Sequence, residues 1–265
     1  LAKIRDFQFT AYGKIGRLTI RNFHRFCSAI RPAFTHPDGQ IMDFSLSTEQ
    51  QMLQETARRF AQTELPAHAT DIENNNSPPN LLLRKRFAEM GFMGINLPSA
   101  YGGAGLGHFE AVLILEELAK ISVAVAFPVF EASFGPALAI AHFAPKALQQ
   151  RILPQVCSGE MVVAVSMSEP NAGTALTDLK TRGKLSGDKI ILNGSKRWCS
   201  GGGHADAYVV YCRLSNDPGA KGIGAVLVEK GAQGFTFGAP ESHMAWRGIA
   251  SADMFFDNVE VPKVN

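Results

Sequence analysis

The chain has 265 residues, 46% of them hydrophobic and 19% charged, a profile typical of globular proteins and not of disordered or fibrous ones. A formal net charge of +2 is too small for the basic footprint of a nucleic-acid-binding protein, so no nucleic-acid partner is expected. No apolar run approaches the roughly 20 residues that a membrane helix requires, so we expect a soluble protein without a membrane partner.

The first 41 residues are basic, with seven Lys and Arg against two Asp. They lack clear periodicity, and a helix-start pattern follows directly after Met42. We expect residues 1–41 to be a disordered extension, such as an upstream-translated segment. An Arg-rich, acid-poor transit peptide is the second interpretation, and a nucleic-acid-binding arm is the third.

Residues 42–160 follow a helical pattern. Ser47 and Gln50 have the spacing of a capping box, and the helix that they open is predicted to stop at Pro66. Further helices are expected over residues 79–91, 109–122, 129–143 and 145–157. The glycine-rich loop at 95–108 follows a helix, whereas a dinucleotide-binding glycine motif follows a strand, so no Rossmann site is expected.

After Gly159 the apolar period changes to two, which is typical of strands. A meander is expected at 183–203, with turns at Gly187-Asp188 and Asn193-Gly194. Short strands at this spacing favour a β-barrel or a β-sandwich. The other predicted strands cover residues 161–168, 207–213, 223–230, 235–238 and 253–261.

The cysteines and histidines do not indicate a metal site. No C-x-x-C pair and no metal-ligand spacing is present, so no metal is assigned. Free thiols in a reducing compartment are expected rather than a disulfide framework. The four cysteines are Cys27, Cys157, Cys199 and Cys212.

The segment SMSEPNAGT, residues 166–174, interrupts a predicted strand with turn-forming residues. Gly173 would let a ligand approach the backbone, and Thr174 offers a hydroxyl, so the amides of this segment could cradle an anion or a ring edge. An ordinary strand-exit turn explains the same residues. Glu169 precedes a proline and is expected to be a structural hydrogen-bond acceptor, not a catalytic carboxylate.

Two aromatic positions admit a structural and a functional interpretation. Trp198 and Ser200 lie two residues apart on a predicted strand, hence on one face, which suits either a core indole or a stacking surface for a planar cofactor. Arg247, next to Trp246, suits either a surface ion pair or the binding of a phosphate or carboxylate.

The order of the segments LPSAYGGAGL, LPQVCSGE, SEPNAGT, LNGSKRWCSGGG and FFDNVEVP resembles the acyl-CoA dehydrogenase family over residues 42–265. The resemblance implies an α+β protein, with an all-α helical N-terminal domain over 42–160 followed by an antiparallel β-barrel domain over 161–265. The family's C-terminal helical domain has no counterpart here, so we expect the chain to be a fragment.

The resemblance also implies a cofactor and a reaction: FAD-dependent α,β-dehydrogenation of an acyl-CoA thioester, as in fatty-acid β-oxidation. It places FAD between two interrupted strands near Glu169 and Trp198, which we expect to face each other across a slot. Thr174 and Arg247 correspond to positions near acyl-CoA. The residues carried over to FAD are Val165, Met167, Ser168, Gly173, Thr174, Trp198, Cys199 and Ser200.

Departures from the family pattern affect substrate recognition more than FAD binding. Ala175 stands where the family often has Asp, and Ile249-Ala250 stands in an R-G-S-D type segment. The family's catalytic base is a Glu of the C-terminal domain, so no catalytic residue is assigned within 1–265, and the fragment alone is expected to be inactive.

The resemblance further implies electron-transferring flavoprotein as the electron acceptor and a homodimer or homotetramer for the intact protein. A cytoplasmic location is expected, with the mitochondrial matrix as the alternative. Two other functions stay open: a related flavin oxidase or monooxygenase on the same scaffold, and a non-catalytic acyl-CoA-binding protein.

Overall fold

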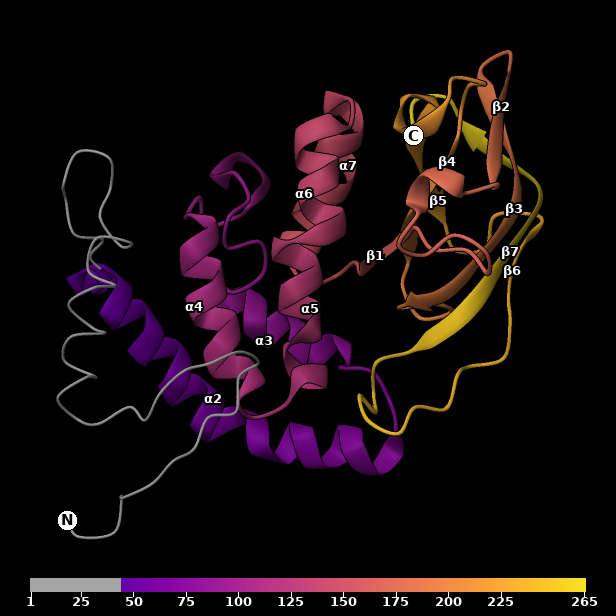
Figure 1. Ribbon diagram of the computed structural model, residues 1–265. Helices are drawn as coiled ribbons and strands as arrows, with labels where there is room; N and C mark the ends of the chain where they lie inside the picture. The colour runs from indigo at the N-terminus through magenta and orange to yellow at the C-terminus, as the bar shows by residue number, and fades with distance from the viewer. Residues whose placement is uncertain (1–43) are drawn as a thin grey trace, which may run out of the picture. The chain divides into compact units, whose positions relative to one another are not determined.

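The structure is a computed structural model that describes residues 44–265 (Figure 1). One compact unit runs from Thr48 to Asn265, and the description below concerns that unit. The predicted disordered extension at 1–41 lies outside the described residues.

The first part of this unit is helical, as expected. Side-chain caps begin two of the helices, because Asn80 accepts a hydrogen bond from the backbone N–H of Leu83 and Ser122 accepts one from Val125. The elements are α2 (Thr48–Asn75), α3 (Leu81–Glu89), the short 3-10 helix η2 (Ser99–Tyr101), α4 (His108–Ala119), α5 (Val123–Ser133), α6 (Gly135–Phe143) and α7 (Lys146–Cys157).

Helix α2 continues through Pro66 to Asn75, so the predicted stop at this proline is wrong. A proline inside a helix removes one backbone donor and crowds the preceding turn. Leu65 and Ile72, on the two sides of the proline, are only 0% and 4% exposed. Burial of this apolar stripe therefore outweighs the local cost of the proline.

The stretch Val123–Phe143 corrects two expectations. It is 21 residues long with a mean hydropathy of 1.7, so by length and composition one described stretch does reach membrane-spanning size. In the structure it forms two helices, α5 and α6, and not one, because Phe134 between them has an extended backbone. Of its most apolar window, 56% is buried inside the protein, as in the core helices of many soluble proteins.

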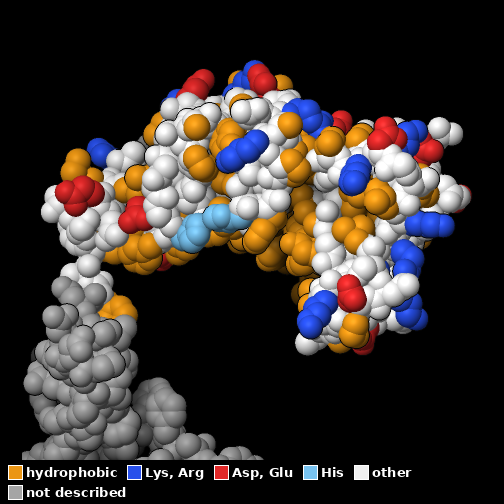
Figure 2. Space-filling view, turned by 90° about the horizontal axis from the view of Figure 1, so that it is seen from above, with side chains coloured by type: hydrophobic (Ala, Val, Ile, Leu, Met, Phe, Trp, Pro, Cys, Tyr) orange, Lys and Arg blue, Asp and Glu red, His pale blue; other side chains and the backbone are white. Residues whose placement is uncertain are grey.

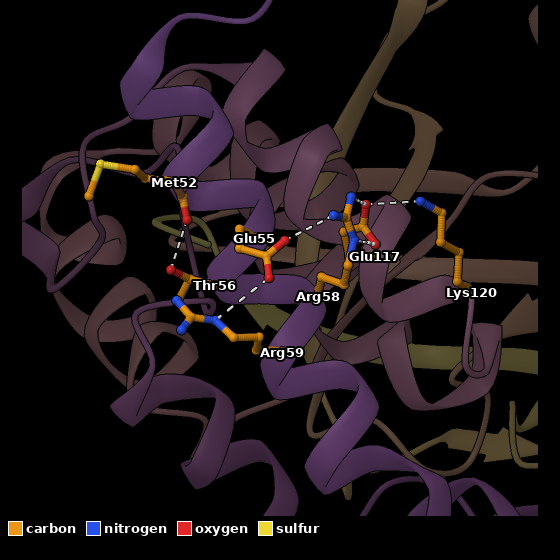
Figure 3. A network of polar contacts seen from close by, with 7 residues as sticks. All are labelled: Met52, Glu55, Thr56, Arg58, Arg59, Glu117 and Lys120. Atoms are coloured by element: carbon orange, nitrogen blue, oxygen red, sulfur yellow. Dashed lines mark hydrogen bonds and ion pairs between the residues drawn. The ribbon is translucent and has the colours of Figure 1, made fainter.

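A charged cluster joins α2 to α4 (Figure 3). Arg58 of α2 donates to both carboxylate oxygens of Glu117 on α4, over 3.0 and 3.2 Å, and Lys120 donates to the same carboxylate over 2.9 Å. Glu117 is only 3% exposed, so these two cations compensate a buried charge. The cluster fixes the position of α2 along α4.

The second part of the unit is a sheet that curls around its own core. The strands are β1 (Val163–Ser166), β2 (Arg182–Ser186), β3 (Lys189–Ser200), β4 (Ala207–Arg213), β5 (Ile223–Glu229), β6 (Phe235–Phe237) and β7 (Ser251–Pro262), and the short 3-10 helices are η3 (Leu176–Asp178) and η4 (Gly219–Gly222).

The sheet is mixed, which corrects the expected antiparallel barrel. Strand β1 pairs with β4 in parallel, from Val163 opposite Ala207 to Ser166 opposite Val210, and β2 also meets β4 in parallel. The pairs β2–β3, β3–β7, β6–β7 and β4–β5 are antiparallel. The strand order β1-β4-β2-β3-β7-β6 is an open path, with β5 on β4. A two-residue period predicts strands but not their direction, so the parallel pairings were not visible in the sequence.

Strand β4 is buried on both faces and joins the two halves of the unit. Ala207 and Val209 belong to the same apolar core as the helices, whereas Tyr208 and Val210, which point the other way, belong to the core inside the curled sheet. The helices therefore pack directly on one face of the sheet. Strand β1, which leads from α7 into the sheet, lies at this junction (Figure 1).

Candidate functional site

The strand end after β1 and the second half of β3 are hydrogen-bonded neighbours. The Arg197 N–H donates to the carbonyl of Ser168 over 3.0 Å, and the Cys199 Sγ donates to the carbonyl of Val165 over 3.4 Å. The structure thus brings together the two segments that the sequence assigned to one site. The expected slot between them is wrong, because they contact each other directly.

Glu169 is a structural acceptor, as expected. Its carboxylate accepts hydrogen bonds from the backbone N–H groups of Lys180 at 2.6 Å and Thr181 at 2.9 Å, and from Lys196 Nζ at 2.9 Å. Burial acts to raise the pKa of Glu169, but these hydrogen bonds outweigh it and hold the pKa below its usual range. The carboxylate is fully engaged and is no candidate for a general base.

A bulge in β3 turns Trp198 out of the sheet. The pairing of β3 with β7 shifts register between Lys196 and Cys199, and Trp198 adopts a φ of 55°. This left-handed conformation costs a non-glycine residue about 1–2 kcal/mol. The indole is 61% exposed, and the Arg197 guanidinium lies 5.5 Å from its ring centroid. Trp198 is therefore an exposed aromatic side chain and not a core residue.

An open cavity of about 310 Å³ lies against this bulge. Trp198 and Ser200 both line this cavity, so the two residues share one site. The sequence had predicted this from the regular alternation of side chains along a strand, which the bulge in fact interrupts. The sequence had also singled out Trp246. Ile249 had been noted only as a departure from the family pattern. The other lining residues were missed, because they lie in or next to a loop without periodicity: His243, Met244, Ala245 and Ser251.

Gly173 and Thr174 lie on an exposed turn beyond a backbone bridge between Glu169 and Ala172. A Cβ added at Gly173 would meet no atom within 4 Å, so this glycine borders open space. Neither residue lines the cavity. Their assignment to a ligand stays a prediction.

Arg247 contacts helix α2 and not the cavity. Its Nε donates to the carbonyl of Glu73 over 2.9 Å and lies 3.3 Å from the Glu73 carboxylate. The structure thus shows a surface ion pair, which is one of the two interpretations of this arginine. Its side chain is still 40% exposed, and its role toward a substrate stays a prediction.

The thiols of Cys157, Cys199 and Cys212 are free, as expected, and all three are buried, whereas Cys27 lies outside the described residues. Burial raises the pKa of Cys199 to about 12, so this thiol is protonated at neutral pH and is not a nucleophile. Within residues 44–265 no group of three His, Cys, Asp or Glu residues is arranged to hold a metal ion.

Besides Glu169, the carboxylate of Glu131 is also buried, between α5 and the sheet. Glu131 of α5 lines a small cavity of about 20 Å³ together with Arg84 and His204. Arg84 donates to the carbonyls of Gly159 and Pro79, both over 3.0 Å. Burial raises the pKa of Glu131 well above its usual value, against the opposing charge of Arg84. The space suits a water molecule and no larger ligand.

Exposed apolar side chains gather on the hollowed side of the described surface in Figure 2. Large apolar side chains near the cavity include Trp198, Met244 and Trp246, which are 61%, 102% and 56% exposed. An apolar surface of this kind beside a cavity is typical of a ligand-binding region.

Comparison with known proteins gives two family matches in succession. The acyl-CoA dehydrogenase N-terminal domain matches residues 47–160, and the acyl-CoA dehydrogenase middle domain matches residues 164–259.

Individual relatives agree with these matches. Mitochondrial isovaleryl-CoA dehydrogenase of Pongo abelii is 35% identical over 223 residues, covering 83% of this chain and 53% of the relative. Butyryl-CoA dehydrogenase from Megasphaera elsdenii superposes with a TM-score of 0.76 at 30% identity, covering 84% of this chain and 59% of that one. PigA with FAD and proline superposes with a TM-score of 0.79 at 25% identity, with coverages of 84% and 59%. The chain thus spans just over half the length of these proteins.

Proposed function

This chain belongs to the acyl-CoA dehydrogenase family, and on that premise we propose that the protein is an FAD-dependent acyl-CoA dehydrogenase. The reaction removes a proton from Cα and a hydride from Cβ of an acyl-CoA thioester and leaves a double bond between these carbons. The observation that carries the proposal is the cavity onto which the β3 bulge presents the Trp198 ring together with Ser200.

The residues around the cavity fit a planar ring with polar edges, such as the isoalloxazine of FAD. Trp198 offers a flat exposed face and Ser200 offers a hydroxyl. Gly173 does not line the cavity, but it borders open space where a side chain would stand. About 310 Å³ is at the small end of ligand pockets, so FAD would also extend over the exposed surface around it. We assign to FAD the set Val165, Met167, Ser168, Gly173, Thr174, Trp198, Cys199 and Ser200, and to acyl-CoA Thr174 and Arg247.

When bound, FAD supplies the acceptor for the β-hydride. The chain's own side chains bind and orient the ring and exclude water. Trp198 would provide a packing surface, and the Ser200 hydroxyl, which lines the cavity, would offer a hydrogen bond to the ring edge. Donors directed at developing negative charge are typically the most effective catalytic contacts. Met244 and Trp246 are exposed apolar side chains beside the same cavity and would exclude water once a ligand is bound.

No catalytic base is assigned within this chain. Among the described residues, those that line the cavity include no carboxylate. Glu169 is engaged by three donors, and Glu131 lines a separate cavity. We therefore propose that the base comes from a part of the protein outside residues 1–265, and that these residues alone bind the cofactor without turnover.

Cofactor binding tests the proposal directly. FAD titrated into the 265-residue chain is expected to quench tryptophan fluorescence in a saturable way, and the Trp198→Phe variant is expected to lose most of this quenching. Mixing the FAD-loaded chain with isovaleryl-CoA or butyryl-CoA without oxygen should leave the flavin absorbance unchanged, whereas the full-length protein should be bleached. A wild-type chain that takes up no FAD would refute the assignment.

A flavin oxidase or monooxygenase is the second candidate, because the similarity to PigA with FAD and proline shows that this fold also accompanies a ligand other than acyl-CoA. The two classes differ in their reaction with oxygen. Slow reoxidation of the reduced full-length protein in air supports the dehydrogenase, and rapid reoxidation supports the alternative. A non-catalytic acyl-CoA-binding protein would bind acyl-CoA without FAD.

The electron acceptor and assembly follow from the same proposal. A dehydrogenase that reacts slowly with oxygen requires another electron acceptor, and we propose an electron-transferring flavoprotein. We also propose that the intact protein is a homodimer or homotetramer, which sedimentation of the full-length protein would test.

A further inference from the structure

Lys196 is a fully buried cation in the middle of the bulged strand β3. None of its side chain is exposed. Burying an ammonium group costs several kcal/mol unless good partners surround it. A lysine at this position therefore calls for a reason beyond packing, because an apolar residue of similar length would fill the same space.

The partners of Lys196 all lie on the strand end after β1. Its Nζ donates to the backbone carbonyl of Met167 over 2.7 Å and to the Glu169 carboxylate over 2.9 Å. Glu169 in turn accepts the backbone N–H groups of Lys180 and Thr181. One side chain thus holds the strand end at two points, and its counter-ion ties that strand end to the chain entering β2.

The same contacts set the bulge. The shift of register begins at Lys196, and the next residue, Arg197, donates its N–H to the carbonyl of Ser168 and its Nε to Asp253, each over 3.0 Å. Trp198 follows directly, with its strained φ of 55°. The backbone conformation that exposes the indole is therefore held on one side by the strand end after β1 and on the other by β7.

We propose that Lys196 and Glu169 are positioning residues for the cofactor, which hold the backbone of Met167 and Ser168 in register with the bulge so that Trp198 and this backbone meet one ligand. The inference rests on the proposed FAD site. Neither side chain lines the cavity, so each acts through the groups that it holds.

The experiment uses Lys196→Met in the 265-residue chain. A Trp246→Phe background leaves Trp198 as the single tryptophan, since the sequence contains two. The matched control is Lys189→Met, which lies on the same strand as Lys196 and removes an exposed ion pair with Glu260 of β7. Trp198 emission without FAD, quenching by FAD and far-ultraviolet circular dichroism are measured at a temperature where every variant is folded.

For Lys196→Met we expect a shifted Trp198 emission maximum without FAD, at least tenfold weaker FAD binding and an altered visible spectrum of the bound flavin, with unchanged circular dichroism. Lys189→Met should match its parent. A folded Lys196→Met chain whose emission, affinity and flavin spectrum all match the control would overturn the proposal.

The double variant Lys196→Met/Glu169→Gln separates positioning from stability. Removing both charges of a buried pair restores much of the stability that removing one loses. A purely structural role would therefore restore FAD binding together with stability, and that result would count against the inference. We expect recovered stability with weak binding, because the Met167 carbonyl still lacks its donor. If the parent chain itself binds no FAD, the proposed function fails, while the emission shift still tests the contact network.

Discussion

Trp198 combines a strained backbone conformation with an exposed side chain. Its φ of 55° favours glycine, yet the site carries a large ring that is 61% exposed. Replacing Trp198 by Gly or by Ala removes the same ring, but only Gly relieves the left-handed strain. We expect the Gly variant to be more stable than the Ala variant by about 1 kcal/mol, measured by urea unfolding. In a regular strand Gly is the less stable of the two, so that order would mean that the bulge does not persist in solution.

Glu131 is expected to make stability depend on pH. Burial raises its folded pKa above the usual 4.5, with Arg84 opposing the shift. As the pH rises from the unfolded pKa toward the folded pKa, the unfolded chain releases this proton first, so the free energy of unfolding falls. Glu131→Gln removes that loss. Its melting temperature should therefore rise relative to wild type as the pH increases above the unfolded pKa. A pH-independent difference for Glu131→Gln would contradict the burial argument.

The contact between α2 and α4 depends on charge as well as on apolar packing (Figure 3). Burial acts to raise the pKa of Glu117, but hydrogen bonds from Arg58 and Lys120 outweigh it and lower the pKa. Arg58→Ala is expected to destabilise the protein, but by less than the loss of one partner from a fully buried pair, because Arg58 is 39% exposed and Lys120 remains.

The loss from Arg58→Ala should itself depend on pH. A lowered carboxyl pKa contributes stability above the unfolded pKa, and this contribution disappears as the pH falls through the folded pKa. The gap between wild type and variant, measured by urea unfolding, should thus close in acid. Arg59→Ala, which breaks a long exposed contact to Glu55, is the control and should have little effect at any pH. An equal gap at pH 3 and pH 7 would rule out the ion pair as the cause.

Strand β3 shows what local sequence patterns predict and what they miss. The expected turn at Gly187-Asp188 lies between β2 and β3, whereas Asn193-Gly194, a dipeptide of the same kind, lies inside β3 at a register shift. Turn dipeptides report a backbone that tolerates positive φ, which a bulge also uses. Periodicity records which residues are buried, so the helices and most strands were predicted. It does not record which strands pair, so the bulge at Asn193-Gly194 was mistaken for a turn.

The two glycines make the difference measurable. At Gly194 a Cβ would lie 2.6 Å from Thr181 Oγ1 and 2.7 Å from its Cα, whereas at Gly187 it would meet nothing within 4 Å. Gly187→Ala should cost about 1 kcal/mol for its left-handed φ alone. Gly194→Ala should cost clearly more in the same urea titration, because the strand must also move. Equal losses would place Gly194 in an ordinary turn.

The candidate site was predictable where a motif carried it and not where the fold assembled it. The sequence assigned Ser168, Trp198 and Ser200 to one site; the structure places them in adjoining segments, and Trp198 and Ser200 line one cavity. The loop that supplies Met244 and Ile249 to the cavity has no periodic pattern, and the strain at Trp198 depends on pairing with β7. Both follow from contacts between residues far apart in the sequence, which a local pattern does not record.

The helices and the sheet share one apolar core, so the unit Thr48–Asn265 should unfold as a whole. Leu227 of β5 is 2% exposed and belongs to the core that contains the helices. Both tryptophans lie beyond residue 160, so their fluorescence reports the sheet, while circular dichroism reports mainly the helices. We expect the two signals to share one midpoint in urea. Leu227→Ala should lower the free energy of unfolding by about 2–5 kcal/mol, and by the same amount from either signal, since a cavity in a shared core weakens both halves. Separate midpoints, or a loss confined to the tryptophan signal, would show that the division predicted near residue 160 also separates two units of stability.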